Sequence, residues 1–194
     1  MVNNLIKIRP AVEADVGTML DIYGPYVTDT TVTFEYSVPG YGDFLKKFRT
    51  VTEKYPWIVA EYDGRVIGYA YADVPFSLRS AYAWDADVSI YLDRSFTGKG
   101  IGVKLYSALH RLLVLCGYKN SYALVTGENL RSMAFHTSLG YRRAGVMEKS
   151  GYKFGRWLDV VWYEYALSGR DPNPAPPVSF KSLDPDAVGK VLNT

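Results

Sequence analysis

The stretch Val88–Val103, VSIYLDRSFTGKGIGV, decides how the rest of the chain is interpreted. Its first apolar residues, Val88, Ile90 and Leu92, alternate with other residues, as in a β-strand with one buried face. The glycine-rich turn TGKGIG follows, and the run VKLYSALHRLLVL after it favours a helix. Glycines let the main chain approach a ligand closely, and the first-turn amides of a helix have no internal partners. This order of elements therefore predicts a phosphate-binding loop.

Two familiar phosphate loops do not fit this turn. A P-loop requires Gly, four residues and then Gly-Lys-Ser/Thr, but here Gly98 is followed five places on by Val103, and Lys99 by Gly100. A dinucleotide fingerprint requires a third glycine three residues after its second. That position holds Val103 when counted from Gly98 and Leu105 when counted from Gly100. Both alternatives are therefore rejected.

Composition limits the class of protein. The 194 residues suit one domain, and 48% apolar and 15% aromatic residues indicate a globular chain. A net charge of +2 does not favour nucleic acid or a membrane as partner. The single cysteine, Cys116, excludes an internal disulfide and lies in an apolar helix face, which predicts a buried, inert thiol. No apolar run approaches the roughly 20 residues of a membrane span, and MVNNLIKIRPA lacks a signal-peptide core, so we expect a cytoplasmic location.

Hydrophobic periodicity predicts a mixed α/β (α+β) sheet. We expect strands over residues 5–9, 57–62, 66–74, 82–92, 121–126, 141–152 and 157–167. We expect helices over residues 14–26, 44 to near 56, 102–115 and 129–139. Asp63-Gly64 predicts a hairpin, and Thr30–Glu35 is interpreted as an extended loop. Residues 1–167 would form the domain, and residues 168–194, with five prolines, would form an extended tail.

The turn fits a third pattern, Gln/Arg-x-x-Gly-x-Gly/Ala, the pyrophosphate loop of the GNAT superfamily of N-acetyltransferases, with Thr97 in place of the usual Gln or Arg. The chain resembles this superfamily over roughly residues 5–167. Within it, four runs resemble the phosphinothricin acetyltransferase subfamily, which includes enzymes that acetylate methionine sulfoximine and methionine sulfone. These runs are YPWIVAEYDGRVIGYAYA (55–72), RSAYAWDADVSIYL (79–92), NLRSMAFHTSLGY (129–141) and GYKFGRWLDVVWY (151–163).

The resemblance implies a GNAT fold, a central, mostly antiparallel mixed sheet flanked by helices. It also implies a homodimer that binds acetyl-CoA and an amino acid together and passes the acetyl group directly to the α-amine. Resistance to a herbicide such as phosphinothricin would follow, whatever the native substrate is. The acetyl-CoA contacts of the family map onto Ile90, Tyr91, Leu92, Gly98, Lys99, Gly100, Ile101, Gly102, Val103 and Asn129.

Asp87 matches the acidic position that serves as general base in the resembling family, where the residue is Glu. An aspartate with an ordinary pKa of about 3.9 is a weak base toward an ammonium, so it would need burial or a relaying water. The alternative is a solvated carboxylate on the polar face of a strand. A backbone N–H near Tyr91 or Leu92 would stabilise the developing oxyanion.

His136 is the second candidate catalytic residue. It follows Asn129 by seven residues on one predicted helix, so the two side chains point the same way. In many GNAT enzymes a tyrosine at this offset protonates the departing thiolate, and an imidazole could do so. The alternative is a histidine that is hydrogen-bonded in a packed interface. His110, in the middle of a helix without a partner motif, is expected to be solvated.

An amino-acid substrate that carries a carboxylate and a phosphinate or sulfoximine group needs cationic and hydroxyl partners. Arg79 and Tyr82 lie just before the predicted catalytic strand, and Thr33 and Phe34 could wall the pocket. No cluster of His, Cys and carboxylate residues has the spacing of metal ligands, so no metal is expected.

Three functions remain open from the sequence. The first is a small-molecule amino-acid N-acetyltransferase, favoured because the aromatic-rich early loop and the GRWLDV hairpin suggest an enclosed site. The second is an acetyltransferase for a peptide or protein amine, which generally requires an open groove. The third is a non-catalytic acyl-CoA-binding module, and the presence of both Asp87 and His136 counts against it.

Overall fold

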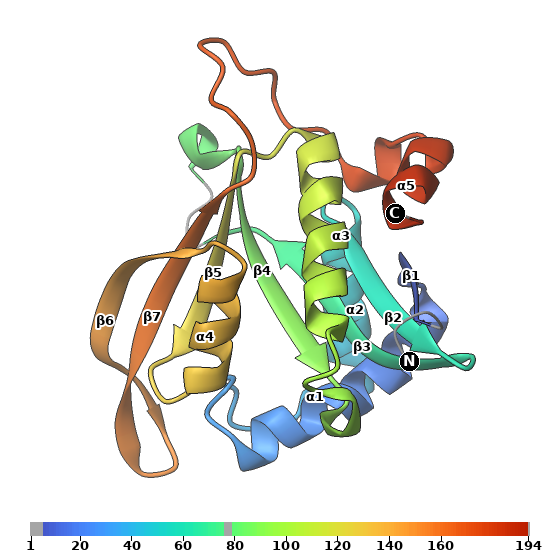
Figure 1. Cartoon of the computed structure of the whole chain (residues 1–194). Helices are drawn as coiled ribbons and strands as arrows, with labels where there is room; N and C mark the ends of the chain where they lie inside the picture. The colour runs from blue at the N-terminus through green and yellow to red at the C-terminus, as the bar shows by residue number, and fades with distance from the viewer. Residues whose placement is uncertain (1–5, 76–78, 194) are drawn as a thin grey trace.

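The computed structural model describes residues 6–75 and 79–193. Within them a seven-stranded sheet of order β1-β2-β3-β4-β5-β7-β6 forms the centre of the molecule (Figure 1). The β4–β5 pair is parallel and the other pairs are antiparallel. The strands are β1 (Lys7–Pro10), β2 (Trp57–Tyr62), β3 (Arg65–Asp73), β4 (Asp85–Leu92), β5 (Asn120–Thr126), β6 (Arg142–Lys153) and β7 (Arg156–Ala166). The predicted fold class, a mostly antiparallel mixed sheet with helices, is confirmed.

The helices connect and cover this sheet. They are α1 (Val16–Asp29), α2 (Tyr41–Thr52), α3 (Ile101–Cys116), α4 (Leu130–Ser138) and α5 (Pro185–Leu192), with short 3₁₀ turns η2 (Glu13–Asp15), η3 (Ser80–Tyr82), η4 (Arg94–Phe96) and η5 (Phe180–Ser182). The sequence signals for the start of α4 and the end of α3 are confirmed. The Asn129 side chain caps α4 by accepting the Ser132 amide at 3.0 Å, and Gly117 ends α3 in the left-handed region at φ 94°.

The two faces of the sheet differ in residue size. Register places Trp57 opposite Tyr71 and Tyr69 opposite Tyr91, so one face carries a layer of aromatic rings. The α2 residues Phe44 and Phe48 pack edge-on against Trp57, at 5.9 and 5.3 Å between ring centroids. The aromatic layer is therefore the face of the sheet against which α2 packs.

The opposite face of β3 carries small residues. Gly68, Ala70 and Ala72 are the alternate residues of this strand, and they lie beside Ile90 and its neighbours on β4. A Cβ on Gly102, in the first turn of α3, would lie 3.6 Å from the Ile90 Cδ1 atom, so α3 covers this face. Small residues beneath α3 let the helix and the turn before it approach the sheet closely.

The C-terminal segment is not wholly extended, and the prediction of an extended tail is wrong for its last part. The Asp184 side chain caps α5, Pro185 begins this helix, and Val188 is buried in the core. The segment is fastened to the domain because the Val178 amide donates to the Cys116 carbonyl at 2.9 Å. The prolines before residue 178 concealed this short helix. The boundary at residue 167 stays a prediction.

The sheet opens between β4 and β5. The two strands pair only at Asp85↔Asn120, Ala86↔Ser121 and Asp87↔Tyr122. Beyond this point β4 stays with β3 as far as Leu92, whereas β5 stays with β7 as far as Thr126. The two strands diverge toward their C-terminal ends in Figure 1. The β5-facing backbone of β4 after Asp87 therefore has no strand partner.

Candidate active site

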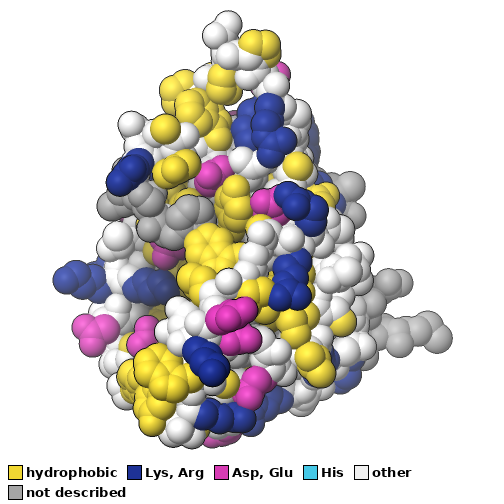
Figure 2. Space-filling model, turned by 90° about the vertical axis from the view of Figure 1, so that its left-hand side faces the viewer, with side chains coloured by type: hydrophobic (Ala, Val, Ile, Leu, Met, Phe, Trp, Pro, Cys, Tyr) yellow, Lys and Arg dark blue, Asp and Glu magenta, His cyan; other side chains and the backbone are white. Residues whose placement is uncertain are grey.

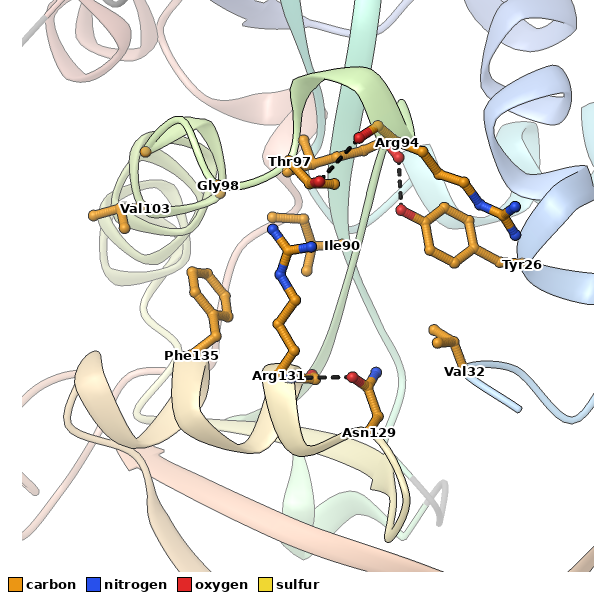
Figure 3. A pocket seen from close by; sticks show the side chains of 14 residues that line it. Tyr26, Val32, Ile90, Arg94, Thr97, Gly98, Val103, Asn129, Arg131 and Phe135 are labelled. Carbon is orange, nitrogen blue, oxygen red and sulfur yellow. Dashed lines mark hydrogen bonds between the residues drawn. The ribbon is translucent and has the colours of Figure 1, made fainter. Parts of the chain in front are cut away.

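A cavity of about 670 Å³ lies at the end of β4, between the glycine-rich turn, the start of α3 and the start of α4 (Figure 3). Its volume is in the range of small-molecule sites. Its lining residues are Tyr26, Val32, Ile90, Leu92, Arg94, Thr97, Gly98, Gly100, Gly102, Val103, Asn129, Arg131, Ser132 and Phe135.

The turn has the backbone geometry that glycine permits. Gly98 and Gly100 have φ values of 76° and 79°, in the left-handed region, and Gly100 is the N-cap residue of α3. The next amides belong to the first helical turn and have no partner within the helix. The Thr97 hydroxyl donates to the Arg94 carbonyl at 2.9 Å, so it stabilises the turn from within. The turn therefore offers backbone N–H groups to an anion.

The structure brings together most of the predicted cofactor residues at this cavity and leaves three out of its lining. Those that line it are Ile90, Leu92, Gly98, Gly100, Gly102, Val103 and Asn129. The Tyr91 ring packs between Tyr23 and Tyr69, and Ile101 is buried in the core. The Lys99 ammonium lies 4.9 Å from the Phe96 ring centroid. Ile101 and Lys99 can therefore contribute only main-chain groups to the turn.

Several lining residues were missed from the sequence. Ser132 follows Asn129 by three residues and Phe135 follows Ser132 by three, so each is a neighbour of the one before it on the helix surface, a signal that periodicity could have used. Tyr26 comes from α1, and its hydroxyl donates to the Leu92 carbonyl at 2.6 Å. No local pattern indicates that contact, because 66 residues separate the partners.

Asp87 lies on the aromatic face of β4, directly opposite Asp73 of β3. Its Oδ1 atom is buried and has no hydrogen-bond partner among the described residues. Burial, and then the charge of Asp73, raise the pKa of Asp87 to about 7, although the Val88 amide and Lys47 act in the opposite direction. The burial of Oδ1 argues against the alternative of a solvated carboxylate, and the role of Asp87 as general base stays a prediction.

Strand alternation identifies the backbone donors of β4 that face away from β3. The Asp93 amide donates to the Ile67 carbonyl of β3, whereas the Leu92 carbonyl accepts from Tyr26. The main-chain groups of Leu92 therefore face away from β3, and those of Ile90 do so as well, since alternate residues share a side. Tyr91 faces β3 instead. The N–H donors at the opening are those of Ile90 and Leu92, which replaces the expectation for Tyr91.

His136 is only 2% exposed and does not line the cavity. Its Nδ1 donates to the Ser132 carbonyl at 2.8 Å, and its Nε2 lies 3.0 Å from the Tyr106 hydroxyl. Burial lowers the pKa of His136, which favours the neutral ring. The geometry matches the alternative of a packed, hydrogen-bonded histidine and does not support direct protonation of a leaving group.

His110 is a further correction, because it is not solvated. Its Nε2 lies 2.7 Å from the Tyr141 hydroxyl, and its ring stacks on Tyr165 at 4.9 Å. Burial lowers the pKa of His110 to about 4. Cys116 is buried as predicted, and burial raises the pKa of its thiol to about 12. None of these groups is available for chemistry at the cavity.

The predicted substrate residues fall into two pairs. Thr33 is buried with its hydroxyl 2.7 Å from that of Tyr23, and the Phe34 ring lies where a Cβ on Gly151 would be. The early loop therefore packs against the β6–β7 hairpin, but neither residue lines the cavity. Arg79 and Tyr82 are exposed at η3, before β4. Their role stays a prediction.

No group of three His, Cys, Asp or Glu side chains in residues 6–75 and 79–193 is arranged to hold a metal ion. Over the same residues, none of the helices has the length and apolar character needed to cross a membrane. Fold and site together define a protein with a cavity at a glycine-rich turn whose backbone suits a phosphate-bearing ligand, on the strand that also carries Asp87.

Comparison with known proteins identifies the family. The model of the acetyltransferase (GNAT) domain matches residues 8–162. The chain is 33% identical to a phosphinothricin N-acetyltransferase from Streptomyces viridochromogenes, over 90% of this chain and 95% of that protein. It is also 33% identical to the L-methionine sulfoximine/L-methionine sulfone acetyltransferase of Pseudomonas aeruginosa, over 88% of this chain and 98% of that protein.

A solved structure gives the same result. The phosphinothricin acetyltransferase from Sinorhizobium meliloti, crystallised in complex with AcCoA, superimposes with a TM-score of 0.83 at 34% identity. The match covers 92% of this chain and 100% of that one. The chain belongs to the GNAT family of acetyltransferases.

Replacing Asp87 with Asn should stabilise the fold at high pH. The folded-state pKa of about 7 lies above the ordinary value of 3.8, so the contribution of Asp87 to stability is full below pH 3.8 and is lost as pH rises through 7. Urea unfolding should show Asp87→Asn to be more stable than the wild type by about 2–4 kcal/mol at pH 8, with little difference at pH 4. The exposed Asp21→Asn serves as control. Equal stability at pH 8 would show that Asp87 is not a buried charge.

His136→Ala should affect stability more than turnover, because it leaves the buried Tyr106 hydroxyl without its partner. We expect a loss of about 1–3 kcal/mol in the free energy of unfolding and a fall in kcat of less than about tenfold. Unfolding curves and steady-state rates, measured on one preparation, separate these effects. A fall of about 100-fold in kcat with unchanged stability would restore His136 as a direct proton donor.

Proposed function

We propose that this protein transfers the acetyl group of acetyl-CoA to the α-amine of a small amino-acid analogue such as phosphinothricin, methionine sulfoximine or methionine sulfone. The observation that carries the proposal is the carboxyl of Asp87, whose Oδ1 atom is buried without a hydrogen-bond partner among the described residues, at the point where β4 and β5 separate. The names of the relatives support the substrate class, and the AcCoA complex of the relative from Sinorhizobium meliloti supports the donor.

The residues present fit acetyl-CoA. The amides between Gly98 and Val103 suit a diphosphate, and Ile90, Leu92 and Phe135 give apolar contact to an uncharged arm. The Asn129 side chain amide nitrogen is left to donate, because its oxygen is used to cap α4. When bound, acetyl-CoA supplies an acetyl group that is activated as a thioester.

Asp87 acts as the general base in this proposal. The acceptor arrives mostly as an ammonium, and Asp87, largely ionised above pH 7, accepts its proton directly or through one water. The free amine then forms a bond to the acetyl carbon, and the bond from that carbon to sulfur breaks. Asp87 and the lining residue Ile90 are on opposite faces of β4, so the two substrates meet through the opening between β4 and β5.

Backbone and histidine groups assist this step. The N–H groups of Ile90 and Leu92 face the opening, where they can stabilise negative charge on the acetyl oxygen. His136 holds the Tyr106 hydroxyl behind Phe135 and acts by positioning these rings. On the acceptor side, Arg79 and Tyr82 remain our candidates for the anionic end of the substrate, with the loop that carries Thr33 and Phe34 as a wall.

We also propose that two copies associate through the β6–β7 side. β6 is an edge strand, and the hairpin exposes Trp157 at 61% and Phe154 at 55%, with Tyr36 of the early loop at 74%. The Tyr36 hydroxyl donates to the Tyr152 carbonyl at 2.7 Å, which fixes this ring on the hairpin. Figure 2 shows apolar side chains on this face among charges of both signs. Exposed aromatic clusters of this kind are typical of interfaces.

Asp87→Ala should lower kcat by about 100-fold or more, because no base takes its place, while the Kd for acetyl-CoA changes by less than about threefold. The wild-type kcat/KM should rise with pH through an apparent pKa near 7. A thiol-release assay with acetyl-CoA and a panel of amino-acid analogues and peptides measures kcat and kcat/KM. Turnover of peptides alone would favour the peptide or protein acetyltransferase, and binding without turnover would favour the non-catalytic module.

Trp157→Glu should convert the proposed dimer into a monomer, because it places a charge in the aromatic patch. Sedimentation velocity at equal concentrations measures the outcome. Val114→Glu is the matched control, since Val114 is also an exposed apolar residue, at 43%, but lies on α3 away from the hairpin. A dimer that persists in Trp157→Glu, or a wild type that is monomeric, would contradict this interface.

A further inference from the structure

The glycine-rich turn has no cation of its own directed at the cavity. Thr97 stands where the family pattern has Gln or Arg, and its hydroxyl is bonded to the Arg94 carbonyl. Lys99 lies over the Phe96 ring and outside the cavity lining. A diphosphate bound to this turn would therefore meet amides, but no positive side chain from the turn itself.

The 3₁₀ turn η4 comes before the glycine-rich turn and contributes Arg94, whose guanidinium is already paired within the protein. Its Nη1 atom lies 3.0 Å from an Asp29 carboxylate oxygen, and its Nη2 donates to the Pro25 carbonyl at 2.7 Å. Figure 3 shows its guanidinium beside Tyr26, on the far side of the turn from α3. Arg94 holds the turn against α1, and its guanidinium is engaged in that contact.

Arg131 is the remaining cation in the lining. It comes from the first turn of α4, and its side chain rises across the cavity toward the turn (Figure 3). Its Nη2 atom lies 3.5 Å from the position that a Cβ on Gly98 would occupy. Within residues 6–75 and 79–193 no carboxylate lies within ion-pair distance of it, so its charge is available to a ligand.

The place of Arg131 in the helix is unfavourable on local grounds. The N-terminal end of a helix carries partial positive charge, so a cation there costs about 0.3–1 kcal/mol. The first turn of α4 contains no acidic residue that would offset this cost. A bound anion would offset it, which is a physical reason for an arginine at this position.

We propose that Arg131 is the diphosphate-binding cation of this enzyme and takes the place of the side chain that is missing at Thr97. The inference rests on the proposed use of acetyl-CoA and deepens it. The guanidinium fork suits phosphate oxygens, and α4 delivers it from the opposite wall of the cavity. The turn supplies the amides, and α4 supplies the charge.

Calorimetric titration with CoA tests this proposal without any turnover. Arg131→Ala should raise the Kd for CoA by about tenfold or more and make it less dependent on salt, because one phosphate contact is lost. Lys46→Ala, which removes an exposed charge on α2, should leave the Kd unchanged. Adding Thr97→Arg to Arg131→Ala should return the Kd to within about threefold of the wild type. Thermal melting confirms that each variant is folded.

Dephospho-CoA distinguishes the diphosphate from the 3′-phosphate. The proposal requires that Arg131→Ala weakens CoA and dephospho-CoA by the same factor. A loss seen only with CoA would assign Arg131 to the 3′-phosphate and overturn the proposal, as would an unchanged Kd or a failure of Thr97→Arg to rescue. A wild type that binds CoA but does not acetylate would reject the proposed function alone, whereas one that does not bind CoA would reject both.

Discussion

The separation of β4 from β5 after Asp87 is the constraint on which the site depends. Each strand is held on its outer side, β4 by β3 and β5 by β7, so neither can turn back to its neighbour. The opening leaves main-chain donors of Ile90 and Leu92 without strand partners, a cost that a folded chain usually avoids. Tyr26 satisfies the Leu92 carbonyl, but the donors stay available. The site is therefore built where the sheet is incomplete.

The same strand alternation that builds the core also sets the chemistry. On one face, Gly68 and the alanines that follow it let α3 approach, which places the glycine-rich turn at the end of β4. On the other face, which also carries the aromatic layer, burial and the charge of Asp73 raise the pKa of Asp87 to about 7. A one-residue shift in register would exchange these faces and abolish both properties.

Much of the fold and part of the site could be predicted from the sequence. Patterns that act over a few residues were sufficient for the strand alternation of β4, the hairpin at Asp63-Gly64 and the cap at Asn129. Asp87 could be placed on its strand from the sequence, but its raised pKa also depends on Asp73, which faces it from β3, and its catalytic role stays a prediction. The partners of His110 and His136, Tyr141 and Tyr106, lie about thirty residues away, and periodicity contains no such information. The α5 helix was missed because the segment from residue 168 onward contains five prolines and little periodicity.

Two features around the opening are locally unfavourable, a third is a backbone shape that requires glycine, and each has a matching ligand group. Asp87 is a buried carboxyl without a hydrogen-bond partner at Oδ1, Arg131 is a cation at a helix N-terminus, and Gly98 and Gly100 hold left-handed backbone. An ammonium would compensate the first, a diphosphate the second, and close approach of phosphate to backbone explains the third. The site has an anion, Asp87, at one end and a cation, Arg131, at the other. An amine acceptor carries the charge opposite to Asp87, and a coenzyme diphosphate carries the charge opposite to Arg131. Under the proposed function, such complementarity would fix the direction in which the two substrates enter, because exchanging them would place like charges together at both ends.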